Sequence, residues 1–120
     1  MLAAILAGRP GVVASHRSAA WLFGLPGFRV GRVELTIQAV TVPRRPSEHR
    51  IHRTSHLPPA HVRLVDGISC TSVARTLFDL SGGVHPSRAE RAVDNAIARR
   101  LVTVAALWRV LDDLAEPARH

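Results

Sequence analysis

The sequence contains no lysine: all sixteen basic side chains are arginine, against nine carboxylates, and the formal net charge is +7. A nuclease of the restriction-endonuclease type needs clustered acidic residues and a lysine or an equivalent group, which hold magnesium and activate water. Here the carboxylates are scattered among predicted turns and helix faces. The pair Gly82-Gly83 also lacks the spacing and the lysine of a phosphate-binding loop. We therefore expect a protein that is not an enzyme and that uses no cofactor.

Cysteine and long apolar runs are also scarce. The single cysteine, Cys70, cannot form an internal disulfide, so nothing in the sequence favours an oxidising compartment and we expect a cytoplasmic protein. The apolar start 1–7 is far shorter than the roughly 20 residues of a membrane-spanning helix, and no basic segment precedes it as in a signal peptide. We expect no association with a membrane.

What the sequence does have is enough apolar material for a core. Hydrophobic residues make up 47% of the 120 residues, charged residues 21%, and the mean hydropathy is +0.11. This length and composition predict one domain over 1–120, with a helical start at 1–30, a sheet region at 31–70 and a helical region at 71–115. The positive charge favours a polyanionic partner, although arginine without lysine is also typical of GC-rich coding.

The periodicity of the apolar residues predicts an α+β fold in which a small antiparallel sheet packs against four to five helices. About three to four strands are expected, over 32–38, 49–55 and 62–68, the last interrupted by the turn pair Asp66-Gly67. Helices are expected over 2–6, 16–23, 71–80, 86–100 and 103–114, with Ser15, Thr71 and Thr103 as caps.

Several short motifs follow one another in a recognisable order. They are Ser15-His16-Arg17-Ser18-Ala19-Ala20, Gly24-Leu25-Pro26-Gly27, Val33-Glu34-Leu35-Thr36, Ile51-His52-Arg53-Thr54, Leu57-Pro58-Pro59, Asp66-Gly67-Ile68, Arg75-Thr76-Leu77-Phe78-Asp79-Leu80, Glu90-Arg91-Ala92-Val93-Asp94 and Leu101-Val102-Thr103. In this order they resemble the central region of AbiEi-type antitoxin-like transcriptional regulators, which belong to type IV toxin-antitoxin systems of actinobacteria. The resemblance spans nearly the whole chain.

This resemblance implies an α+β fold and a regulatory or defence-associated role. Longer members of the family usually carry an N-terminal winged helix-turn-helix, and many end in a Vsr-like endonuclease domain. The present sequence has room for neither, so the functions of those domains are not carried over to any of its residues. We expect either a misassigned start, with a winged helix encoded upstream of Met1, or a truncated gene product.

The strongest candidate for nucleic-acid binding is a basic stretch around the second expected strand. Its candidate residues are Arg44, Arg45, Arg50, His52 and Arg53. On a strand, alternate donors such as Arg50 and His52 would share one face and could contact DNA phosphates. The alternative is a solvated loop followed by an edge strand that its charges protect from aggregation.

Two other histidine patterns invite a chemical interpretation. His49, His52 and His56 have spacings that could gather imidazoles around zinc, but His49 and His52 lie on opposite faces of a straight strand and no cysteine completes the set, so we expect no metal. Ser15 next to His16 could suggest a nucleophile and its base. Neighbouring helix positions point about 100° apart, however, so we expect Ser15 to cap a helix instead.

The remaining polar candidates have structural explanations. Arg75 and Asp79 are four residues apart on one helix face, and Asp94 on the next helix could join them in a partly buried ion pair. Cys70, at the junction of a strand and a helix, is expected to be a buried apolar side chain and not a reactive thiol.

The sequence therefore predicts a non-catalytic AbiEi-like antitoxin or transcriptional-regulator module that associates with nucleic acid or with a partner protein. DNA would be held through its phosphate backbone. The alternative is a truncated interaction remnant without DNA affinity of its own, which associates with itself or with another protein through apolar side chains such as Trp108 and Leu111.

Overall fold

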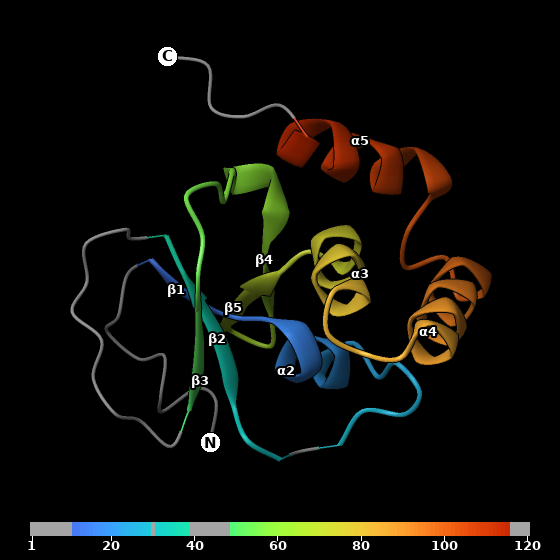
Figure 1. Cartoon of the computed structure of the whole chain (residues 1–120), viewed down its shortest axis with the longest axis horizontal. Coiled ribbons are helices and arrows are strands. Elements are labelled where there is room, and N and C mark those ends of the chain that lie inside the picture. Colours follow the sequence, from blue (N-terminus) through green and yellow to red (C-terminus); the bar gives the residue numbers. More distant parts are fainter. Residues whose placement is uncertain (1–10, 30, 39–48, 116–120) are drawn as a thin grey trace.

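A computed structural model of the chain describes residues 11–29, 31–38 and 49–115, and its elements confirm the α+β class (Figure 1). Along the chain they are β1 (Val12–Ala14), α2 (His16–Leu22), β2 (Glu34–Ile37), β3 (Arg50–Arg53), the 3-10 helix η1 (Pro59–His61), β4 (Val62–Val65), β5 (Ile68–Thr71), α3 (Val73–Ser81), α4 (Pro86–Ala98) and α5 (Val104–Ala115). The expected helix over 2–6 lies outside the described residues. No helix in the described ranges is long and apolar enough to cross a membrane.

The sheet has five strands in the order β3-β2-β1-β5-β4, and it is mixed. β1 pairs with β2 and β4 with β5 in antiparallel fashion, whereas β1–β5 and β2–β3 are parallel. The expectation of three to four antiparallel strands was therefore wrong in number and direction. The central strand β1 has only three residues, too few for an alternating pattern to be visible in the sequence.

The turn between β4 and β5 is the one that the sequence indicated. Asp66 and Gly67 both have positive φ angles, +50° and +77°, as a two-residue hairpin turn requires. Val65 and Ile68 pair directly across it. The expected third strand is thus a hairpin of two strands, and it forms one end of the sheet.

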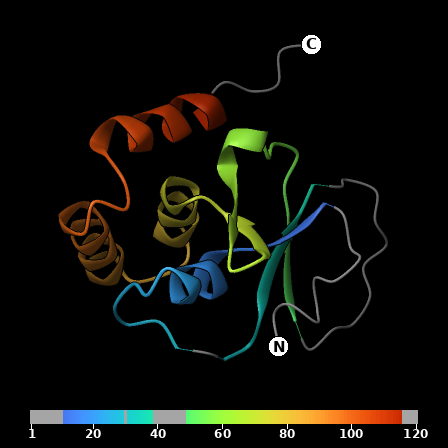
Figure 2. The ribbon, with the colours of Figure 1, turned by 180° about the vertical axis from the view of Figure 1, so that it is seen from behind.

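The four helices gather on one side of the sheet, with α3 between α2, α4 and α5 (Figures 1 and 2). Leu77 and Leu80 of α3 join the core with Leu35 of β2 and Cys70 of β5. The expected cap Thr71 instead ends β5, and Ser72 caps α3 by accepting a hydrogen bond from the Arg75 N–H. This arrangement brings polar side chains of α2 and α3 against the sheet, where the sites described below are formed.

Candidate functional site

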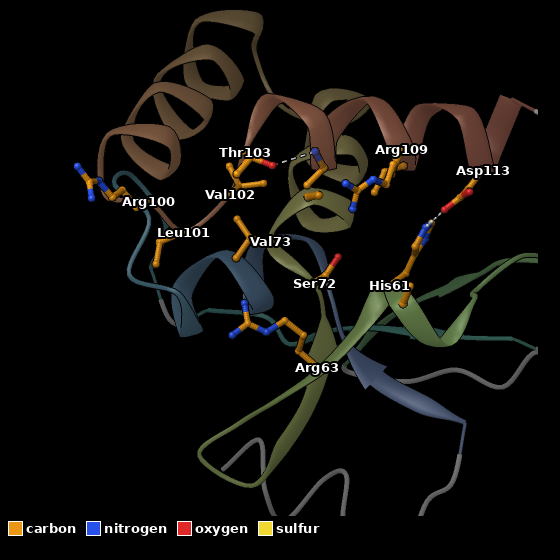
Figure 3. Close-up of a pocket in the computed structure, with 14 residues that line it drawn as sticks. His61, Arg63, Ser72, Val73, Arg100, Leu101, Val102, Thr103, Arg109 and Asp113 are labelled. Carbon is orange, nitrogen blue, oxygen red and sulfur yellow. Dashed lines mark hydrogen bonds and ion pairs between the residues drawn. The ribbon is translucent and has the colours of Figure 1, made fainter.

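A basic pocket of about 340 Å³ lies between the β4–β5 hairpin, the start of α3 and α5 (Figure 3). Three arginines line it: Arg63 of β4, Arg100 in the connection between α4 and α5, and Arg109 of α5. Figure 3 shows Arg63 and Arg109 on opposite sides of the region, while the Arg100 side chain points outward at one end. All three side chains are exposed, so their charges are available to a ligand.

Two helix N-termini add to the positive character of this pocket. Ser72 and Thr103, which precede α3 and α5, both line it. Their hydroxyls accept hydrogen bonds from Arg75 N and Ala106 N, as in capped helices. Since a helix N-terminus carries a partial positive charge, the pocket is suited to an anion such as a phosphate group.

The basic stretch expected to bind nucleic acid is only partly described, since Arg44 and Arg45 lie outside the described residues. Arg50 is exposed on β3, an edge strand, as the alternative reading of this stretch expected. His52 forms a hydrogen bond with Glu34 on the neighbouring strand β2, while Arg53 is half-buried. In the described part, therefore, His52 of the expected row of donors is already bonded within the protein, whereas Arg50 is exposed.

His52 belongs to a cluster that spacing along the chain did not predict: the His16–Glu34–His52 cluster. The three come from the start of α2, from β2 and from β3, and one ligand atom from each lies within 4.8 Å of the others. The imidazoles of His16 and His52 stack with ring centroids 3.6 Å apart. His52 Nε2 lies 2.8 Å from Glu34 Oε2, so the carboxylate accepts a hydrogen bond from this ring.

Neighbouring groups hold the cluster in place. The Glu34 side chain is only 4% exposed, and its Oε1 accepts hydrogen bonds from the backbone N–H and the guanidinium of Arg17. Burial raises the pKa of Glu34, but the bonds from His52 and Arg17 outweigh it and hold the pKa below the usual value. Glu34 is therefore a buried carboxylate that stays ionised.

Ser15 and His16 are in contact, contrary to the expectation that they point apart. Ser15 Oγ lies 2.9 Å from His16 Nδ1 and accepts a hydrogen bond from Thr36 Oγ1 at 2.7 Å. Ser15 occupies the N-cap position, but its side chain makes no capping hydrogen bond. The reason is the backbone at His16, whose φ of +51° departs from helical geometry. Ser15 is fully buried and so positions His16 without being exposed as a nucleophile.

A second group of polar residues connects the segment between β3 and β4 with α3 and α5. We call it the Arg75 network, after the residue at its centre. Arg75 donates from Nε to Asp79 Oδ1 at 3.0 Å, which confirms the expected pair. It also donates to His61 Nδ1, and His61 Nε2 lies 2.9 Å from Asp113 of α5. The ion pairs found in the described residues do not include Asp94, which is exposed on α4.

The thiol of Cys70 is buried, as expected. Burial raises its pKa to about 11, against a smaller lowering by Arg63. At neutral pH this sulfur is a protonated, apolar side chain and not a nucleophile.

The sequence alone does not predict the His16–Glu34–His52 cluster, because its three residues come from three separate segments of the chain. The spacing of histidines was informative only within the strand that carries His52. The parallel pairing of β2 and β3 sets Thr36 beside His52 and Glu34 beside Arg50, and no local pattern encodes that register. Comparison with models of protein families, with curated proteins and with solved structures finds no match to this chain.

Proposed function

We propose that this chain is a non-catalytic binding module that contacts the phosphate backbone of a nucleic acid, as part of an AbiEi-like antitoxin or transcriptional regulator. The observation that carries the proposal is the basic pocket with Arg63, Arg100 and Arg109 on its walls. Among the described residues that line it, Asp113 is the one carboxylate; it offsets one of the three arginine charges, so the pocket keeps a net positive charge.

The distribution of charge over the surface supports the same function. The described exposed arginines are Arg29, Arg32, Arg50, Arg63, Arg88, Arg91, Arg99, Arg100 and Arg109. Phosphate contacts by such residues release counterions and supply most of the affinity of non-specific binding. A backbone-binding module needs no base contacts, and we assign none.

The test is fluorescence anisotropy of a labelled duplex titrated with the protein from about 50 to 200 mM salt. We expect binding that weakens steeply with salt, with a slope reduced by about 0.9 for each phosphate contact removed. The double substitution Arg100→Gln with Arg109→Gln should weaken binding, whereas Arg29→Gln with Arg91→Gln removes the same charge outside the pocket and should have a smaller effect.

A further variant tests the basic stretch separately, with Arg44, Arg45, Arg50 and Arg53 changed to Ala. A loss of affinity here and not in the pocket variant would move the contact surface to the β3 edge. A folded protein that binds no duplex even at the lowest salt would refute the proposed function.

A second candidate function is that of an interaction remnant that associates with itself or with another protein. The outer face of α5 favours it. Val104, Trp108 and Leu111 are 55%, 61% and 41% exposed and follow one another at helical spacing. Exposed apolar side chains in a row are typical of protein contacts. Sedimentation velocity of the protein and of Trp108→Gln would test self-association, which the substitution should weaken.

A further inference from the structure

We infer that the His16–Glu34–His52 cluster is a binding site for a divalent transition-metal ion such as Zn²⁺. Two imidazoles and one carboxylate would supply three ligands and leave a fourth position open. The inference is independent of nucleic-acid binding, because the cluster lies at β2, β3 and α2 and includes no residue of the basic pocket.

The chemistry of the donors fits such an ion. Neutral imidazole nitrogen and carboxylate oxygen are common Zn²⁺ ligands, with bonds of about 2.0–2.2 Å. Around a tetrahedral ion, ligand atoms with these bond lengths lie roughly 3.3–3.6 Å apart. Here they all lie within 4.8 Å of one another. The two imidazole rings are stacked nearly parallel, so one ring has to rotate out of the stack before both nitrogens point at one ion.

The atoms of these side chains that would not bind the ion are already held. Ser15 contacts Nδ1 of His16, so Nε2 is the nitrogen that would bind an ion, and Thr36 donates a hydrogen bond to Ser15 in turn. Glu34 Oε1 is held by Arg17, while Oε2 faces His52. Metal sites have this outer layer of hydrogen bonds, which orients the ligands and sets the tautomer of each histidine.

The backbone at His16 is a second, independent indication. Its φ of +51° lies in the left-handed region, which few residues other than glycine adopt. Strained positions of this kind persist only where the surroundings enforce them, and they concentrate at ligand sites. The strain here places the His16 ring against His52 and beside Glu34.

Some charged groups near the cluster favour the binding of a cation, and others oppose it. The Asp79 carboxylate, whose Oδ2 is buried without a hydrogen-bond partner in the described part of the chain, acts on His16 from α3. Arg17 opposes a cation, but its guanidinium also contacts Gly83 O and is 37% exposed, which screens its charge. With His52 32% exposed, an ion can reach the ligands from solvent.

The experiment uses the full, tag-free chain, titrated with Co²⁺ while its visible absorption is followed and then with Zn²⁺ as competitor. We expect saturation at one ion per chain and displacement of Co²⁺ by Zn²⁺. His52→Gln and His16→Gln should abolish this signal. Ser15→Ala, which removes only an orienting hydrogen bond, should weaken binding by about 10- to 100-fold.

The matched control is His85→Asn, which changes an exposed histidine at the N-cap of α4 and keeps a capping side chain. This variant should bind as the wild type does. Circular dichroism shows whether each variant folds. We change His52 and not Glu34, because His52 lies on an edge strand and its substitution is better tolerated than that of a buried carboxylate. The inference is overturned if the folded wild type takes up neither ion, or if folded His16→Gln and His52→Gln still bind.

Discussion

The His16–Glu34–His52 cluster and the Arg75 network use the same kinds of side chain but differ in how fully their histidine rings are engaged by the protein. In the Arg75 network, Arg75 can only donate, so His61 Nδ1 accepts and His61 Nε2 donates to Asp113. Both ring nitrogens of His61 are therefore occupied, and the ring is 2% exposed. In the cluster, His52 bonds the Glu34 carboxylate, the His16 ring stacks on His52, and His52 remains 32% exposed.

This difference separates a structural role from a binding role. Arg75 bonds Thr54 and His56 O after β3, His61 of η1 and Asp79 of α3, and His61 in turn bonds Asp113 of α5. A buried charge with this many protein partners has little capacity for a ligand, and removing one partner strands the others. The cluster is held by bonds from Ser15 and Arg17, and it is accessible to solvent at His52, as a ligand site must be.

The largest expected effect comes from exchanging the central arginine of each site. Arg75→Met should lower the free energy of unfolding by about 3–5 kcal/mol, because it leaves Asp79 buried without its ionic partner. Arg17→Met, at a half-exposed arginine, should cost about 1 kcal/mol or less, because the backbone N–H of residue 17 and the His52 ring still bond the Glu34 carboxylate. Urea denaturation of both variants measures the two values, and equal losses would mean that the two sites do not differ as described.

A smaller difference is expected between the histidines. His61→Gln should cost about 1–3 kcal/mol, because it leaves buried hydrogen-bonding groups of the Arg75 network unpaired. His52→Gln in metal-free protein should cost less, because water can replace the lost bond at an edge strand. If His52→Gln proves the more destabilising of the two in thermal unfolding, the cluster is a structural clamp on β3.

The features that could be predicted from the sequence are those whose residues lie close together along the chain. The Arg75–Asp79 pair and the Asp66-Gly67 turn are local, within four residues, and both were predicted. The partner His61, by contrast, reaches Arg75 only because the β4–β5 hairpin pairs Val62 with Thr71 and so returns His61 to the start of α3. The cluster and the pocket likewise depend on the mixed strand order and the packing of α5, which local periodicity does not encode.

The smallest expected effect is the reaction of Cys70 with a disulfide reagent, which should be close to none in the folded protein. This reaction reports on solvent access to the buried centre of the sheet. Cys70 is the only thiol in the chain, so any reaction with a disulfide reagent is assigned to it. Because burial raises its pKa to about 11, the folded protein should react slowly at neutral pH and faster only as the pH approaches that value. Denatured protein supplies the control, and rapid reaction of the folded chain at neutral pH would contradict the burial of this thiol.

The measurement that tests the contrast most directly is long-range ¹H–¹⁵N NMR of the histidine side chains during addition of Zn²⁺. We expect the Nε2 resonances of His16 and His52 to shift together and saturate at one equivalent, while both nitrogens of His61 stay unchanged. Shifts at His61, or none at His16 and His52, would show that the open cluster and the closed network do not divide binding and structure between them.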